Sequence, residues 1–150
     1  MTDQVNGSSF DVVYIPVEKV QEVFPLVQQE IAKTLDKAQN GYDHNDILKL
    51  LNDNAMQLWI VFDHKKNKKL AFIISEIIER PQLNFISIFM TIGENRKIWE
   101  VKAQDTLEQF ALKNNCSKAI LIARKGWSKS FKKTGYKETH TLLEKQLKKG

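Results

Sequence analysis

The chain has 150 residues, which suits a single domain of ordinary size. Hydrophobic residues make up 42% of it and charged residues 27%, a globular composition that excludes a largely disordered chain. No apolar run approaches the roughly 20 residues that cross a bilayer. The N-terminus also lacks a basic segment followed by an apolar one, so we expect neither a membrane span nor a secretory signal.

Cysteine and histidine are scarce. The single cysteine, Cys116, excludes an internal disulfide and indicates a reducing compartment. His44, His64 and His140 lie far from Cys116 and from one another in the sequence. Because a structural zinc ion needs four such ligands in a few short motifs, we expect no metal site.

Positive charge gathers at the C-terminal end. Residues 113–150 hold eleven Lys and Arg against two acidic residues, which leaves +9 there and −4 over residues 1–112 of a total of +5. Such a segment attracts polyanions, so nonspecific nucleic-acid contact through residues 113–150 is one hypothesis and a solvated lysine-rich face is the other. Only one of the eleven is an arginine, the usual reader of base edges, which argues against sequence-specific DNA recognition.

The apolar spacing predicts the element order β, α, α, β, β, β, α, β, α, β. Residues 1–10 are polar and are expected to form a flexible leader before a domain over residues 11–150. Expected strands cover residues 11–15, 56–63, 70–79, 84–91, 118–123 and, as a strand or hairpin, 136–147. Expected helices cover residues 20–35 with a break at Pro25, residues 47–51 after a cap at Asp43 or Asn45, and residues 96–115 and 126–133. Short turns connect the middle strands, so these strands should form an antiparallel meander. The later strand–helix–strand unit requires two parallel neighbouring strands. We therefore expect an α/β (α+β) fold with one mixed sheet.

Three groups of residues carry a resemblance to a known family. They are Gln57-Leu58-Trp59 at the first meander strand, Cys116 before the fifth strand, and Ala123-Arg124-Lys125-Gly126-Trp127 followed by Phe131 and Gly135-Tyr136. With the element order, these residues resemble the GNAT (Gcn5-related N-acetyltransferase) superfamily over about residues 12–147, in particular the small GNAT-like proteins of tailed, T7-like phages. The resemblance implies a single GNAT-like domain with an antiparallel meander, splayed parallel strands and helices on both faces.

The resemblance implies a cofactor site. The superfamily transfers an acyl group from acetyl-CoA to an amine and holds the pyrophosphate at the start of the helix after the fourth strand. The matching residues here are Gly93, Asn95, Arg96 and Lys97, with Arg124 at the exit of the fifth strand as a further phosphate or carboxylate ligand. The superfamily loop has a second glycine where Asn95 stands, and Glu94 adds a negative charge, so the loop is degenerate. Weakened cofactor binding and an ordinary charged helix start both remain open.

One carboxylate is a candidate general base. Glu76 lies on the third strand, near where family members often place that base, and it interrupts an apolar run. Apolar neighbours would raise its pKa toward useful values, whereas the alternative is an outward-facing glutamate. Phe131 stands where many family members have the tyrosine that protonates the leaving thiolate, and phenylalanine has no proton to give.

A second function stays open beside acyl transfer. The degenerate loop and Phe131 favour a non-catalytic, virion-associated protein, either an internal virion protein or an assembly protein, that acts through contacts with a phage structural or host protein. Its expected contact residues are Trp127, Lys132 and Lys133. Either role implies the host cytoplasm or a packaged virion as its location, and not secretion.

Overall fold

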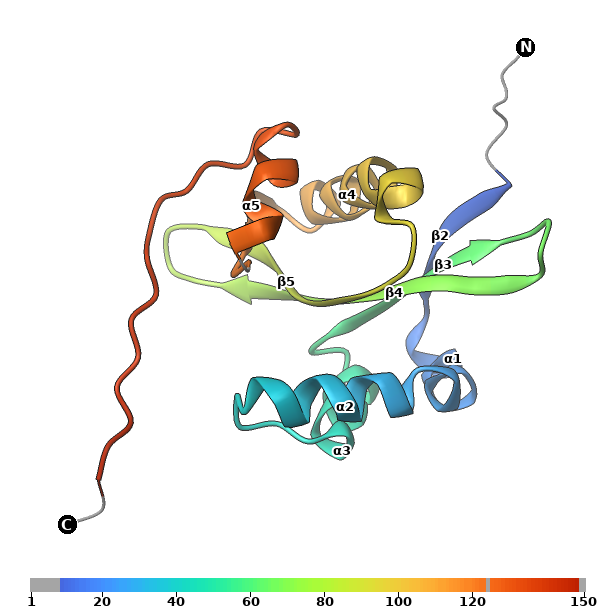
Figure 1. The fold of residues 1–150 in the computed structure, drawn as a ribbon, viewed down its shortest axis with the longest axis horizontal. Coiled ribbons are helices and arrows are strands. Elements are labelled where there is room, and N and C mark those ends of the chain that lie inside the picture. Colours follow the sequence, from blue (N-terminus) through green and yellow to red (C-terminus); the bar gives the residue numbers. More distant parts are fainter. Residues whose placement is uncertain (1–8, 124, 149–150) are drawn as a thin grey trace.

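Five strands form one sheet in the order β2-β3-β4-β5-β6 in the computed structural model, which describes residues 9–123 and 125–148, without the side chains of 125–128 (Figure 1). The strands from β2 to β5 pair antiparallel, and β6 lies parallel to β5. The expected mixed sheet is therefore confirmed. The strands are β2 (Phe10–Ile15), β3 (Gln57–Asp63), β4 (Lys68–Glu79), β5 (Asn84–Gly93) and β6 (Cys116–Leu121). Most of the expected leader lies outside the described residues, and the first strand begins at Phe10, within that segment.

Helices cover both faces of the sheet. Figure 1 shows α1, α2 and α3 together on one face, and α4 and α5 on the other. None of the described helices is both long and apolar enough to cross a membrane. The helical elements are α1 (Val17–Val23), the 3-10 turn η1 (Phe24–Leu26), α2 (Gln28–Ala38), α3 (His44–Asn52), α4 (Arg96–Lys113) and α5 (Lys125–Lys132).

Local sequence signals set the first helices. The expected break at Pro25 is confirmed, because the chain passes through η1 between α1 and α2. Asp43 is the cap of α3: its carboxylate accepts from the Asp46 amide at 2.9 Å, and the Asp46 carboxylate accepts from the Asp43 amide at 2.9 Å. This reciprocal pair satisfies two of the N–H groups that a helix start leaves without partners.

The sheet separates two apolar cores. Ile31, Leu35, Ile47, Leu51, Phe72 and Ile74 belong to the core under α1–α3. Trp59, Ile73, Ile86, Trp99 and Leu107 belong to the core under α4. Strand β5 supplies Met90 to the first and Ile86 to the second, in agreement with its two-sided apolar pattern.

A chain of buried polar groups joins β3 to β4. The Trp59 indole N–H donates to Ser75 Oγ at 2.9 Å, and Ser75 Oγ donates to Gln57 Oε1 at 2.8 Å. All three residues are buried, so these bonds replace the water that the groups lose on folding. They also fix the β3–β4 register, in which Gln57 faces Ser75.

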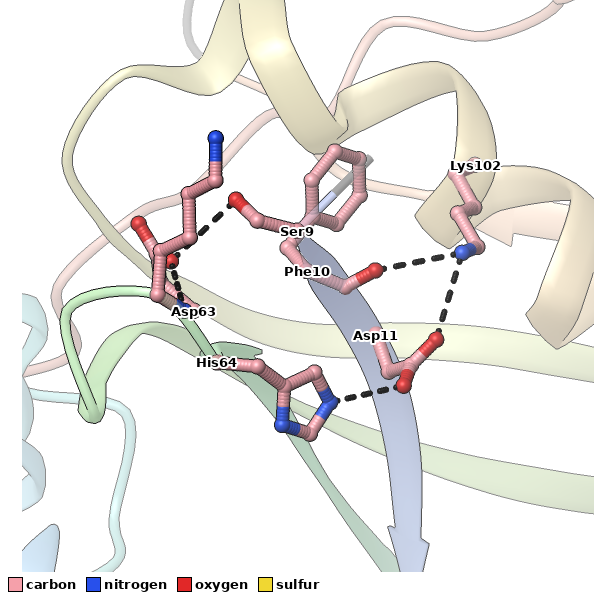
Figure 2. A network of polar contacts seen from close by, with 7 residues as sticks. Ser9, Phe10, Asp11, Asp63, His64 and Lys102 are labelled. Atoms are coloured by element: carbon pink, nitrogen blue, oxygen red, sulfur yellow. Dashed lines mark hydrogen bonds and ion pairs between the residues drawn. The ribbon is translucent and has the colours of Figure 1, made fainter. Parts of the chain in front are cut away.

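An ionic network ties the start of β2 to the rest of the sheet (Figure 2). Asp11 Oδ2 lies 2.7 Å from His64 Nε2, and Lys102 Nζ lies 3.4 Å from Asp11 Oδ1. The Ser9 hydroxyl donates to Asp63 Oδ1 at 3.2 Å. The network therefore connects β2, the β3–β4 turn and α4.

The expected strand or hairpin over residues 136–147 is wrong. The chain leaves α5 through a turn at Gly135, whose φ of 99° only glycine adopts readily, and the Tyr136 amide bonds to the Phe131 carbonyl at 3.1 Å. Residues 136–148 then run away from the sheet without helix or strand (Figure 1). Alternation makes a strand only where another strand pairs with it, and the described part of this chain places none beside the segment.

Candidate functional site

Gly93 ends β5 and faces Ala71 on β4. A Cβ built on Gly93 would lie 2.2 Å from the Ala71 Cβ and 2.7 Å from the Leu70 carbonyl oxygen. Real Cβ atoms do not approach other atoms that closely, so any side chain here would push the strands apart. Because Gly93 has no Cβ, β5 can pack closely on β4 at this position.

The loop after Gly93 is held in place before α4 begins. The Glu94 amide donates to the Leu70 carbonyl at 3.2 Å, and the Trp99 indole N–H donates to the Glu94 carbonyl at 2.7 Å. Asn95 occupies the N-cap position with φ 54°, and its side chain makes no capping bond. No acidic side chain lies in the first turn either, and the nearest one in the sequence is Glu94, one residue before the cap.

A recess of about 470 Å³ opens beside this helix start. It brings together Asn95, Arg96 and Lys97, which the sequence had singled out, with Ile98 and Glu100 of α4 and Ser130 of α5. Its size falls within the range of small-molecule sites in proteins. These three residues are consecutive in the chain, and the structure adds α5 as the opposite wall.

Arg96 takes part in a network that joins α4 to α5. Its guanidinium donates to Glu100 Oε1 at 3.0 Å and to Ser130 Oγ at 2.9 Å, and the Ser130 hydroxyl donates to Glu100 Oε1 at 3.1 Å. Sequence analysis missed Glu100 and Ser130, although the spacing of four residues from Arg96 to Glu100 typically forms a helix ion pair. Much of the Arg96 charge is therefore neutralised locally, whereas Lys97 is exposed and makes no ion pair with the described residues.

Behind the recess, the space between α4, α5 and the sheet is almost filled. The remaining cavity of about 20 Å³ is lined by Ile73, Ile88, Trp99, Gln104 and Phe131, among others. Trp99 and Phe131 are only 1% and 5% exposed. A cavity of this size has room for about one water molecule.

Gln104 contributes a buried donor to this cavity. Its Oε1 accepts from Thr134 Oγ1 at 2.5 Å, while its Nε2 has no hydrogen-bond partner among the described residues. A buried N–H group without a partner costs free energy, so this position suits a ligand or water that brings an acceptor.

The parallel pair beside the cavity stops halfway along β5. Pairing between β5 and β6 runs from Asn84 opposite Cys116 to Ile88 opposite Leu121, and from there to Gly93 no described strand pairs with β5 on that side. On its other side β5 has a bulge, because Ser75 pairs with Ile88 and Ile74 pairs with Met90. Bulges and unpaired strand ends often border active sites, since they leave peptide groups available to a ligand.

Glu76 lies on the other face of the sheet from the recess. It follows Ile74, which belongs to the core under α1–α3, and Ser75 points to the opposite side with Trp59. Burial raises the pKa of the Glu76 carboxyl above its ordinary value, as the sequence predicted. Across the pair it faces Ser87, one residue before the point where β6 pairing ends.

The remaining expected residues have different positions. Burial raises the pKa of Cys116, which is an inert thiol in the core under α4. Tyr136 packs against Phe131 with ring centroids 5.2 Å apart, and burial, with a smaller effect from Glu108, raises its pKa to about 12. Lys132 and Lys133 are exposed, and Lys132 pairs with Glu138 at 3.1 Å. Arg124 and the side chain of Trp127 lie outside the described residues.

Several solved structures with this arrangement are described as acetyltransferases. An aminoglycoside acetyltransferase, meta-AAC0020, from an uncultured soil metagenomic sample, in complex with trehalose, is 14% identical, with a TM-score of 0.68 over 96% of this chain and 100% of that one. A predicted acetyltransferase with acetyl-CoA from Clostridium acetobutylicum is 18% identical, with a TM-score of 0.66 over 91% and 96%. A ribosomal-protein-alanine N-acetyltransferase from Brucella melitensis biovar Abortus 2308 is 16% identical, with a TM-score of 0.65 over 91% and 99%.

This chain has the GNAT fold. The sequence resemblance is thus confirmed at the level of the fold, since identities this low carry the fold alone. No protein-family model and no curated protein matches the sequence. Within the described residues, no three His, Cys, Asp or Glu side chains gather closely enough to hold a metal ion.

Proposed function

We propose that the protein is a GNAT-type N-acyltransferase that takes an acyl group from acetyl-CoA and passes it to an amine. The observation that carries the proposal is the recess at the start of α4, where Asn95, Arg96 and Lys97 face Ser130 around about 470 Å³ of open space. A helix start without a side-chain cap, with the exposed cation Lys97 beside it, is a favourable place for phosphate. The GNAT fold supports the choice of acyl transfer over other phosphate-ligand chemistry.

The outer and inner parts of the site fit such a cofactor differently. The recess has room for the diphosphate, and Lys97 is its exposed cation, while the Glu100 carboxylate in its lining pairs with Arg96. Further in, Gln104 Nε2 is a buried donor that would serve a carbonyl group of the cofactor arm. Phe131 is buried and lines the same small cavity as Gln104, so its side chain must turn away before a cofactor arm can reach Gln104 Nε2.

Acetyl-CoA supplies an activated thioester carbonyl when bound. The protein's part is to orient the amine and to accept its proton. Glu76 suits this second role, because it lies opposite Ser87, beside the residue where the β5–β6 pair ends, and its raised pKa makes it a stronger base. An amine entering from the α1–α3 face would meet this carboxylate.

Calorimetric titration with acetyl-CoA tests the cofactor site. We expect binding by the wild type and about tenfold weaker binding by Lys97→Glu, since reversing one charge beside a phosphate costs on the order of 1.4 kcal/mol. Lys113→Glu at the far end of α4 is the matched control and should bind like the wild type. Wild-type protein that neither releases heat nor gains thermal stability at millimolar acetyl-CoA would contradict the proposal.

Glu76→Gln tests the proton acceptor separately. The variant should bind acetyl-CoA normally and lose acyl transfer by about 10²–10⁴-fold, the usual contribution of a general base. Acyl transfer at the wild-type rate by this variant would remove Glu76 from the mechanism while leaving the cofactor site intact.

A second candidate function follows from the filled interior. Trp99 and Phe131 occupy the space behind the recess, and Phe131 brings no proton donor. These features favour a non-catalytic GNAT-fold protein that works through contacts with a phage structural or host protein, in assembly or within the virion. Lys132→Glu with Lys133→Glu should then abolish a complex recovered with purified virions, whereas Glu76→Gln should not affect it.

The basic end also supports a nucleic-acid contact. If residues 113–150 bind polyanions nonspecifically, affinity for duplex DNA should fall steeply as salt rises, by about 10³–10⁵-fold between 50 and 200 mM for six to ten phosphate contacts. Gel shifts over that salt range measure it. A flat salt response would exclude this contact.

A further inference from the structure

The recess at the start of α4 and the small cavity behind it share a wall. Arg96 and Glu100 line the recess of about 470 Å³ and also line the interior cavity of about 20 Å³. On α5, Ser130 lines the recess, and the next residue, Phe131, lines the interior cavity. These four residues therefore stand between the recess and the interior.

A hydrogen-bonded ion pair holds this wall together. The Arg96 guanidinium donates to Glu100 Oε1 at 3.0 Å and to Ser130 Oγ at 2.9 Å, and the Ser130 hydroxyl donates to the same Glu100 oxygen at 3.1 Å. The Arg96 and Glu100 side chains are only 27% and 14% exposed, so water screens this pair less than it screens a surface pair. The three bonds fix α5 against α4 at the residue next to Phe131.

The interior behind the wall holds a donor that lacks an acceptor. Gln104 lines the interior cavity and is 7% exposed, and its Nε2 has no hydrogen-bond partner among the described residues. Such a buried N–H group costs free energy, which a ligand with an acceptor would recover. Ile73, Ile88 and Leu107 add apolar lining. The interior thus suits a ligand group that is mostly apolar and carries a carbonyl oxygen.

We propose that Arg96, Glu100 and Ser130 form a gate that an anion in the recess opens, so that the interior admits only ligands that carry a phosphate group. The gate rests on the proposed function, because the recess is the proposed phosphate site. A phosphate there competes with Glu100 for the planar guanidinium of Arg96, which binds phosphate through two N–H groups. It also repels the Glu100 carboxylate, which lines the same recess. Ser130 then loses its bonds to both, and Phe131 beside it turns away from the interior.

The gate makes phosphate a condition for entry in addition to a source of affinity. A thioester that carries a diphosphate opens the wall, whereas the same thioester without phosphate meets it closed. Lys97 lines the recess but not the interior cavity, and it makes no ion pair with the described residues. Its charge therefore attracts the anion without holding the wall.

Thiol labelling measures the opening directly. Ala103 lines the interior cavity and is 3% exposed, so Ala103→Cys places a thiol behind the wall. Inorganic pyrophosphate at millimolar concentration should raise the rate at which methyl methanethiosulfonate labels this thiol by about tenfold or more. Leu107→Cys, at a second lining residue, should respond in the same way. The wild type is the matched control, because its buried Cys116 is not among the residues that line the cavity, and its rate should not change.

Variants of the wall distinguish a gate from general loosening of the fold. Glu100→Gln combined with Ser130→Ala should label Ala103→Cys fast without pyrophosphate, and pyrophosphate should add little. Lys97→Glu leaves the wall intact, so labelling should stay slow until more pyrophosphate is added. Pyrophosphate that leaves both engineered thiols unchanged, or that accelerates Cys116 equally, would overturn the gate. Slow labelling in the wall variant without pyrophosphate would overturn it too.

Failure of the gate and failure of the proposed function give different results. If acetyl-CoA binds and supports acyl transfer while pyrophosphate leaves the labelling rate unchanged, the gate is wrong and the proposed function stands. If pyrophosphate accelerates labelling and the protein transfers no acyl group, the proposed function is wrong and the gate stands.

Discussion

Gly93 and Ala71 face each other across the β4–β5 pair so closely that a methyl group on Gly93 would lie 2.2 Å from the Ala71 Cβ. The glycine that sequence analysis assigned to a phosphate-binding loop therefore has a packing reason of its own. Its presence does not by itself indicate a cofactor.

Gly93→Ala should destabilise the protein by about 1–3 kcal/mol, the usual cost of overpacking a tight contact. Denaturant unfolding measures the change. The double variant Gly93→Ala with Ala71→Gly should recover part of the loss, because it removes the Ala71 Cβ, the atom that the new methyl group would approach most closely. An unchanged unfolding midpoint in Gly93→Ala would show that the strands separate there without cost.

Ser75→Ala should cost about 1–3 kcal/mol, because it leaves the buried Trp59 N–H and Gln57 Oε1 without their shared partner. Ser117→Ala, at an exposed position on β6, is the matched control and should change little. Urea unfolding followed by tryptophan fluorescence reports both variants. Equal stability of the two would mean that water replaces the missing hydroxyl.

Phe131→Ala should show whether the space behind the recess is the path of the cofactor arm or part of the packed core. Removing this buried ring should lower stability by about 3–5 kcal/mol. If the space behind the recess is the path of the cofactor arm, the same change should tighten acetyl-CoA binding. Loss of stability without any gain in affinity would instead assign Phe131 to the core alone.

The raised pKa of the Glu76 carboxyl should make the free energy of unfolding fall as pH rises. Burial raises its folded pKa above the unfolded value, so the folded state holds the proton more tightly. The stabilisation is complete below the unfolded pKa and is lost as pH rises through the folded one. Glu76→Gln should therefore flatten this slope, as measured by unfolding at a series of pH values. A steeper slope in the variant would contradict the burial of this carboxylate.

Asp11 should make the free energy of unfolding fall as pH is lowered, the opposite of the effect of Glu76. The hydrogen bond with His64, together with Lys102 and against a smaller effect of burial, holds the pKa of Asp11 below its ordinary value. Its contribution is present above the unfolded pKa of about 4 and is lost as pH falls through the folded value. The effect is small, because both side chains of the pair are more than half exposed. Asp11→Asn should remove it, whereas Asp36→Asn on α2 should not.

The sequence allowed the elements to be predicted because their signals are local. Pro25 breaks the first helix, Asp43 caps α3, Gly135 ends the turn after α5, and apolar spacing distinguishes strands from helices. The same local information located the start of α4 and the raised pKa of Glu76. It failed at residues 136–147, because a strand needs a neighbour and a pattern cannot say whether one is present.

Contacts between distant residues decided the rest. Only the folded chain places Ala71 against Gly93, Ser130 against Arg96, and Phe131 over the cavity that Gln104 lines. Those pairs lie up to 34 residues apart, and nothing in either member's local pattern specifies the other. The sequence by itself determined which elements form and where a helix start could hold an anion. The tertiary structure alone decided how much room remains beside it, because that depends on which side chains from other elements pack into the same space.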